Sequence, residues 1–186
     1  TETGAVAEVL RGGVLRGRKS LALPGADLDP PTMTASDVEN IRVAASCGVT
    51  GVMQPFVRSR RDLETVRRAL DENGGANIRL FAKIENQMGL ERLPEFLETA
   101  DEIVIARGDL GNAMPLWELP AAQKRIEAQC RKAGKPFMVV TQMLASMEQN
   151  PVPTRAEVSD IFNAVADGAA AVMVTGETAV GKWPVE

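Results

Sequence analysis

A lysine and a carboxylate lie two residues apart at the end of a short apolar run. Lys83 and Glu85 would share one face of the chain if residues 78–84 form a strand that continues past its end. Projecting together, they could bind a metal ion and an anionic substrate. A plain ion pair at a strand end explains the same spacing equally well, so other residues must decide.

A second acid lies between glycines directly after another apolar run, residues 102–106. Gly108 and Gly111 would let the backbone approach a ligand and direct N–H groups at its oxygens. Asp109 would add a hard oxygen ligand of the kind that Mg²⁺ prefers. Taken alone, an ordinary Gly-Asp turn is the simpler interpretation of this segment.

Two threonines complete the set of candidate residues. Thr141 follows the apolar run that begins at Phe137, and Thr175 follows the run that begins at Ala171, with Glu177 two residues later. A hydroxyl at the end of a strand can contact a phosphate or pass a proton. Because threonine is common at strand ends, each is a candidate only in combination with the other segments.

A proline-rich loop and a capping motif follow Thr141. Residues 150–153 predict a rigid loop, after which Thr154 caps a helix with Glu157 at the capping-box position. We expect Arg155, at the start of this helix, to be structural or interfacial rather than catalytic.

The composition restricts the chemistry that these residues can perform. The 186 residues include no histidine, which excludes histidine-based triads, histidine general bases and histidine-rich zinc sites. Lysine, carboxylates, threonine or a metal ion with oxygen ligands remain. This set of donors suits Mg²⁺ or Mn²⁺ better than Zn²⁺.

The charge and the cysteines restrict partners and location. The net charge of −4 gives no basic field for nucleic acid or an anionic membrane, and we find no bilayer-spanning apolar run or signal peptide. Cys47 and Cys130 lack a metal-ligand spacing, so we predict two small buried side chains in a reducing compartment. We therefore expect a cytoplasmic protein that binds neither nucleic acid nor membrane.

Strand-like and helical patterns alternate from about Ser36 onward. The helices are expected at 37–47, 60–70, 90–99, 120–133 and 154–167, and the strands at 51–56, 78–84, 102–106, 137–141 and 171–175. Such a series implies a parallel sheet. No GxGxxG loop marks a doubly wound sheet, whereas polar residues gather at several strand ends, as in a barrel. We predict an α/β fold of the (β/α)₈ TIM-barrel type, with five of the eight strands in this chain.

The beginning of the chain has a different character. Residues 1–20 are rich in glycine and basic residues and predict a hairpin or a linker. A short strand is expected at 21–23, followed by a turn at 24–25 and an extended connection at 29–31.

In their order and spacing, these segments closely resemble the pyruvate kinase family, from about Gly13 to the end of the chain. The similarity is to bacterial pyruvate kinases or to short pyruvate-kinase-like proteins. The stretches that carry it are LPG at 23–25, FVR at 56–58, AKIEN at 82–86, ARGDLG at 106–111, AGKP at 133–136, TQML at 141–144, NPVPTRAEVSD at 150–160 and GET at 176–178.

The resemblance implies a glycolytic phosphotransferase that converts phosphoenolpyruvate and ADP into pyruvate and ATP with Mg²⁺ or Mn²⁺. Glu85 and Asp109 correspond to the acids that hold the divalent ion. Lys83 corresponds to the lysine that stabilises charge on the moving phosphoryl group and on the enolate. Backbone N–H groups of Gly108 and Asp109 would bind the substrate carboxylate, and Thr141 would contact the substrate and assist protonation of the enolate.

Some positions depart from the family pattern. Thr175 stands where the family usually has serine, so the hydroxyl is kept and a proton relay with Glu177 is a hypothesis. Pro55 stands where a serine is frequent. Arg18 and Lys19 resemble the basic end of the mobile lid domain, which makes Lys19 a candidate for contact with the nucleotide.

Much of the family's machinery lies outside the matched stretches. The first three barrel strands, the usual K⁺ ligands, most of the nucleotide site, most of the lid and the C-terminal regulatory domain have no counterpart here. Residues 1–25 then correspond to the end of the lid domain and a linker, and residues 26–186 to a partial barrel. K⁺ is therefore a cofactor of the family whose ligands we do not find in this chain.

Five strands leave two open sheet edges, which are a liability for a lone chain. We expect an excerpt of a longer chain, a fragment, or a barrel that another chain or another copy completes in a homo-oligomer. Two functional alternatives stay open. One is a metal-dependent lyase or aldolase that forms a pyruvate enolate, and the other is a non-catalytic segment that keeps only the fold.

Overall fold

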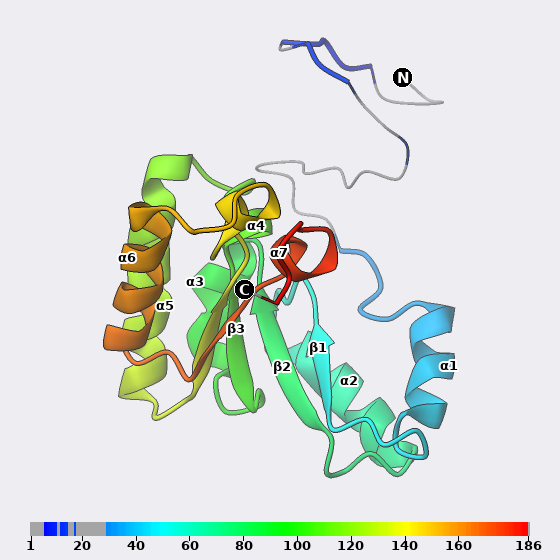
Figure 1. Ribbon diagram of the computed structural model, residues 1–186. Helices are drawn as coiled ribbons and strands as arrows, with labels where there is room; N and C mark the ends of the chain where they lie inside the picture. The colour runs from blue at the N-terminus through cyan, green and yellow to red at the C-terminus, as the bar shows by residue number, and fades with distance from the viewer. Residues whose placement is uncertain (1–5, 11, 15–16, 18–28, 186) are drawn as a thin grey trace.

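A single parallel sheet organises the protein (Figure 1). The computed structural model describes residues 6–10, 12–14, 17 and 29–185. All neighbouring strands pair in parallel, and their order in the sheet is their order in the chain. The strands are β1 (Gly51–Gln54), β2 (Arg79–Ile84), β3 (Glu102–Ala106), β4 (Phe137–Val140) and β5 (Ala171–Met173).

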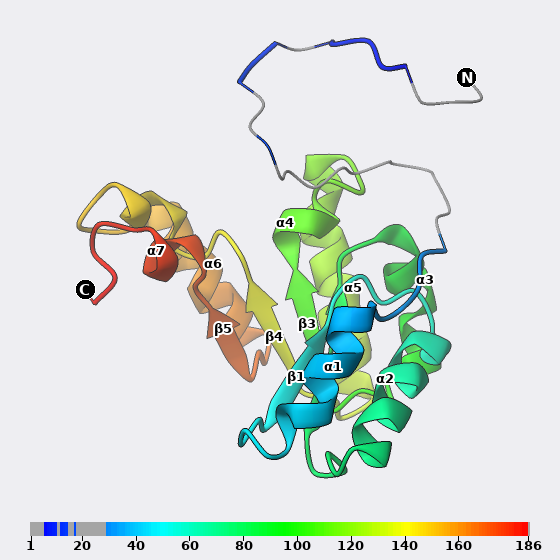
Figure 2. The same ribbon diagram turned by 90° about the vertical axis from the view of Figure 1, so that its right-hand side faces the viewer.

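Helices alternate with these strands. The longer helices are α1 (Ala35–Ala44), α2 (Arg60–Glu72), α3 (Gln87–Phe96), α5 (Leu119–Lys132) and α6 (Arg155–Ala166). Short helical segments are α4 (Arg107–Leu110), α7 (Gly176–Ala179) and the 3₁₀ turns Leu116–Glu118 and Ala145–Glu148. Figure 2 shows the curvature of the sheet, with α2, α3 and α5 along one side of it.

The two faces of the sheet differ in what covers them. One face contributes Leu80, Ala82 and Ile84 to a large apolar core that the long helices complete. The opposite face carries a separate small cluster centred on Val104 and Val140. A doubly wound sheet would reverse its strand order and place helices on both faces. The observed order therefore confirms the predicted barrel-type α/β fold, present here as an open array of five strands.

Local sequence signals explain where the helices begin and end. Thr34 caps α1, and Thr154 caps α6 as predicted; each forms a capping box with the acid three residues later. Gly134 follows α5 with φ of 62°, and Gly168 follows α6 with φ of 96°. These left-handed conformations suit glycine and stop the helices where the sequence predicts.

Several boundaries differ from expectation. β1 ends at Gln54 instead of residue 56, because Pro55 and the left-handed Phe56 turn the chain away. The expected Gly-Asp loop after β3 is a short helix, α4. Cys130 is buried as predicted, but Cys47 is exposed, so that prediction was wrong. Cys47 lies in the turn after α1.

Other expectations fall on residues outside the described ranges. The strand expected at 21–23, the turn at 24–25, Lys19 and the domain boundary after residue 25 all lie outside the described residues. Among the helices that are described, none has the length and apolar character needed to cross a membrane.

Candidate active site

The carboxyl ends of the strands bring the predicted residues to one edge of the sheet. Ile84 of β2 pairs with Ile105 of β3, and Ala106 pairs with Val140 of β4, so the segments that follow these strands leave side by side. Figure 1 shows α4 and α7 beyond the tips of the strands at this edge. In parallel α/β proteins, ligand sites are built at this end.

Lys83 and Glu85 form the ion pair that the sequence suggested. Lys83 Nζ lies 2.7 Å from Glu85 Oε1, and the side chains are 25% and 1% exposed, respectively. Glu85 Oε2 accepts a hydrogen bond of 2.8 Å from the backbone N–H of Phe56, in the turn after β1. The buried carboxylate is therefore held from two sides. Because each carboxylate oxygen has two lone pairs, both contacts leave acceptor capacity for an ion.

Thr141 lies directly against Gly108. The backbone N–H of Gly108 donates a hydrogen bond of 2.8 Å to Thr141 Oγ1, and that hydroxyl donates to the Val140 carbonyl at 2.6 Å. A Cβ on Gly108 would lie 3.4 Å from the same oxygen. The N–H expected to bind a substrate carboxylate is thus already engaged, so such a ligand would have to share it with Thr141 or displace the hydroxyl.

The turn after β4 has an unusual backbone. Thr141 and Gln142 have φ of 70° and 54°, in the left-handed region. This region is rare for residues other than glycine and rarer still for a β-branched residue such as threonine. A conformation of this kind persists only where the surrounding structure holds it, and it is frequently found at functional sites.

Arg107 is the main residue that the sequence analysis missed. Its Nη2 and Nε donate to the Thr141 carbonyl at 2.8 and 3.3 Å, and its Nη1 donates to Asp160 Oδ2 at 2.5 Å. Its side chain is only 9% exposed. The available signal was an arginine placed directly after the buried strand β3, since a buried arginine needs partners.

Glu177 joins the loops that follow β4 and β5. Its Oε1 accepts from the backbone N–H of Leu144 at 2.9 Å and its Oε2 from that of Thr175 at 2.8 Å. Burial raises the pKa of Glu177. Hydrogen bonds from the N–H groups of Glu177 itself, Thr175 and Leu144 lower it by more than burial raises it, so the pKa lies below its ordinary value. The carboxylate is ionised and tied to backbone, which is the geometry of a loop clamp.

The acids at this edge suit a hard divalent ion. Within the residues that the structure describes, no three acidic or cysteine side chains converge as a ready-made ligand set. Mg²⁺ is commonly held by only one or two carboxylates, with water and substrate oxygens as its other ligands. Two carboxylates such as those of Glu85 and Asp109 meet this requirement in number and in donor type.

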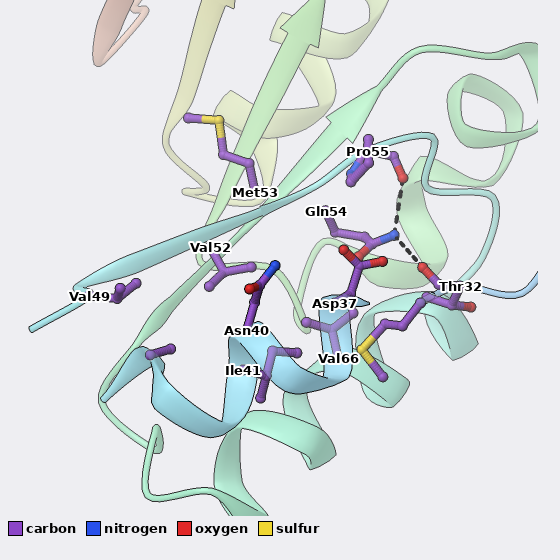
Figure 3. Close-up of a pocket in the computed structure, with 12 residues that line it drawn as sticks. Thr32, Asp37, Asn40, Ile41, Val49, Val52, Met53, Gln54, Pro55 and Val66 are labelled. Carbon is purple, nitrogen blue, oxygen red and sulfur yellow. Dashed lines mark hydrogen bonds between the residues drawn. The ribbon is translucent and has the colours of Figure 1, made fainter. Parts of the chain in front are cut away.

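Two cavities lie away from these residues. One of about 260 Å³ lies between α1 and the free side of β1, lined by apolar residues such as Ile41 and Val52 (Figure 3). There Gln54 Nε2 donates to the Thr32 and Pro55 carbonyls, each at 3.2 Å. The other, of about 350 Å³, lies between α5 and α6, and its lining includes the Arg107–Asp160 pair. None of Lys83, Glu85, Asp109 and Thr141 lines either cavity.

The fold and this edge define a class: a parallel α/β protein of the (β/α)₈-barrel type with polar residues gathered at the carboxyl ends of its strands. Comparison with known proteins narrows the class. The sequence model of "Pyruvate kinase, barrel domain" matches residues 1–186. The chain therefore belongs to the pyruvate kinase family.

Individual relatives agree with this assignment. The human protein "Pyruvate kinase PKLR" is 47% identical over 183 residues, which are 98% of this chain and 32% of the relative. The "Pyruvate kinase" of Geobacillus stearothermophilus is 43% identical over 181 residues, 97% of this chain and 31% of the relative. That of Sporosarcina psychrophila is 43% identical over 178 residues, 96% and 30%. This chain thus spans roughly a third of the length of these relatives.

Proposed function

We propose that this chain carries the metal-binding and phosphoenolpyruvate-binding side of a phosphotransferase site, at which phosphoenolpyruvate and ADP give pyruvate and ATP. One observation carries the proposal. The Lys83–Glu85 pair and the Gly108–Thr141 contact lie at the same carboxyl edge of a sheet whose sequence belongs to the pyruvate kinase barrel. A cation, two acids, backbone N–H donors and a hydroxyl are the groups that this reaction needs.

The charged residues would act on the phosphoryl group. Glu85 and Asp109 would hold Mg²⁺ or Mn²⁺, and the bound ion would neutralise charge on the phosphate oxygens. Lys83 would place a second positive charge beside the group as it transfers and beside the enolate left behind. The 2.7 Å contact with Glu85 would keep the ammonium in position before the substrate arrives.

The neighbouring loops would bind the rest of the substrate. Backbone N–H groups of Gly108 and Asp109 would bind the substrate carboxylate. As that carboxylate takes the Gly108 N–H, the Thr141 hydroxyl would be released toward the enolate and could assist its protonation. Thr175 would supply the second hydroxyl, and Glu177 would hold the Thr175 loop through its contact with the Thr175 N–H.

Other parts of the proposal lie beyond these residues. Residues 1–25 would be the end of a lid domain and a linker, with Lys19 close to the nucleotide. The remaining nucleotide contacts and the K⁺ ligands would come from other barrel segments, in a longer chain or in another copy. We propose that the protein acts in the cytoplasm, as expected for a glycolytic enzyme, and assembles as a homo-oligomer.

One experiment tests this function and its alternatives. The chain is assayed alone and as a replacement for the aligned segment in the pyruvate kinase of Geobacillus stearothermophilus, with phosphoenolpyruvate, ADP and Mg²⁺, with and without K⁺. We expect pyruvate and ATP from the folded graft and none from the chain alone. The matched control is the same graft with Lys83→Met, which should fold but be inactive.

The other outcomes have distinct meanings. A folded graft that forms no pyruvate would contradict the proposal and favour the non-catalytic alternative. Metal-dependent exchange of pyruvate methyl protons with solvent, without turnover of phosphoenolpyruvate and ADP, would instead favour a lyase or aldolase.

A further inference from the structure

Fixing one carbonyl group determines the shape of the turn after β4. The Thr141 carbonyl belongs to the peptide plane between Thr141 and Gln142, the two left-handed residues. The orientation of this plane sets ψ of Thr141 and φ of Gln142. Whatever binds the carbonyl therefore selects the left-handed turn over the extended continuation that threonine prefers.

Arg107 binds that carbonyl twice. Its Nη2 and Nε donate to the Thr141 oxygen at 2.8 and 3.3 Å, and the next residue, Gly108, donates its N–H to the Thr141 hydroxyl at 2.8 Å. Two consecutive residues after β3 thus hold both the carbonyl and the side chain of Thr141. A lysine could not reproduce the fork, because its ammonium is a single point of charge.

Asp160 of α6 fixes the remaining end of the guanidinium. Its Oδ2 accepts from Arg107 Nη1 at 2.5 Å, while Arg107 Nη2 also lies 2.9 Å from Met143 Sδ. The Arg107 side chain is buried, so its rotamer is set by these contacts rather than by water. Through Arg107, helix α6 is connected to the backbone of the turn that carries Thr141.

We infer that Arg107 is a positioning residue: it holds the Thr141–Gln142 turn in its left-handed form, and Asp160 orients the guanidinium that does so. The consequence for catalysis rests on the proposed function, in which Thr141 faces the substrate. The conformational consequence does not, so the two can be tested separately.

The conformational test uses the 186-residue chain. The intraresidue HN–Hα distance is short only when φ is positive, so the nuclear Overhauser effect at Thr141 and Gln142 reports the turn directly. We expect short distances in the native chain and longer ones in Arg107→Lys and in Asp160→Asn. Asp160→Asn keeps an acceptor oxygen and the side-chain shape. It therefore provides a second test of the turn if Arg107→Lys fails to fold.

Arg67 provides the matched control. Its guanidinium likewise binds two backbone carbonyls, those of Ile78 and Gly75, at 2.7 and 2.6 Å, close to the start of β2. Arg67→Lys should alter stability without changing φ at Thr141. If Thr141 and Gln142 keep their short HN–Hα distances in Asp160→Asn and in every folded Arg107 variant, the inference is wrong.

The catalytic test uses the graft, if it is active. We expect Arg107→Lys to lower kcat on the order of tenfold while KM for phosphoenolpyruvate stays within about twofold, because misplacing a group costs rate more than binding. Adding Gln142→Gly should restore part of kcat, since glycine adopts positive φ freely. An inactive native graft would count against the proposed function alone, and the Overhauser measurement would still decide the role of Arg107.

Discussion

The hydroxyl of Thr141 accepts a hydrogen bond of 2.8 Å from the backbone N–H of Gly108, which joins the ends of β3 and β4 at the candidate site. A Cβ at position 108 would lie 3.4 Å from Thr141 Oγ1 and 3.6 Å from Thr141 Cβ, which is ordinary van der Waals contact. An added methyl group would therefore fill the space beside the Thr141 hydroxyl without a clash.

Gly108→Ala should therefore narrow the space beside the Thr141 hydroxyl, where the proposal has the substrate carboxylate bind, with little loss of fold. We expect the affinity of the active graft for phosphoenolpyruvate to fall about tenfold, which corresponds to about 1.4 kcal/mol. Isothermal titration with Mg²⁺ present measures the change. Gly13→Ala, where nothing lies within 4 Å of the added Cβ, is the control and should leave affinity unchanged. Equal affinities in both variants would show that the substrate does not use the space beside Gly108.

The two acids should control ion binding without controlling the fold. Glu85→Gln keeps an oxygen for the Phe56 N–H but loses the charge, and Asp109→Ala removes the second proposed ligand. We expect each to weaken Mn²⁺ binding in the presence of phosphoenolpyruvate by at least about tenfold. Electron paramagnetic resonance of free Mn²⁺ measures the change in binding. The control is Asp101→Asn, because the Asp101 carboxylate accepts a hydrogen bond from the Leu80 N–H and is not a proposed ligand. An unchanged titration would remove the substituted acid from the ligand set.

The capping acid of α6 should make stability depend on pH. Burial raises the pKa of Glu157, but hydrogen bonds from Ser146 and Thr154 outweigh this and lower it to about 2. Since the folded pKa lies below the ordinary glutamate value of 4.5, the stabilisation is present above that value and is lost as pH falls toward 2.

Glu157→Gln should accordingly reduce the free energy of unfolding at pH 7 by about 1 kcal/mol, the usual value of a helix cap. Urea unfolding at several pH values should show the difference from the native chain shrinking between about pH 4.5 and pH 2. Glu39→Gln, in an exposed ion pair with Arg42, should show almost no effect. A difference that is independent of pH would mean that the charge of Glu157 does not matter.

The two cysteines should differ sharply in reactivity. Burial raises the pKa of Cys130 to about 12, whereas Cys47 is exposed. Because the thiolate is the reactive form, a disulfide reagent at pH 8 should modify one thiol per native chain and both after unfolding. Cys47→Ser should leave no rapidly reacting thiol. Fast modification of two thiols in the native chain would contradict the buried position of Cys130.

The sequence predicts the elements well because their signals are local. Alternating and helical periods mark the strands and helices, and Thr154 with Glu157 marks the start of α6. Strand ends are less well predicted, as at β1, because the turn at Phe56 is fixed partly by its bond to Glu85, 29 residues away.

The candidate site, too, could be predicted from local sequence signals only in part. Lys83 and Glu85 are neighbours in sequence, so their pairing could be anticipated. Arg107 could not be assigned a role, because its partners Thr141 and Asp160 are 34 and 53 residues further along the chain. The left-handed backbone of Thr141 is likewise invisible in the sequence, since threonine has no intrinsic preference for it.

The bond between Phe56 and Glu85 has a thermodynamic consequence. Phe56 follows β1, which pairs only with β2 among the described residues, so its N–H belongs to the outermost part of the sheet. If that strand frayed, Glu85 would lose its hydrogen bond from the Phe56 N–H. Ion binding by Glu85 would in turn oppose the fraying. By reciprocity, any segment that covers the β1 edge would tighten ion binding by the same factor by which the bound ion tightens the docking of that segment.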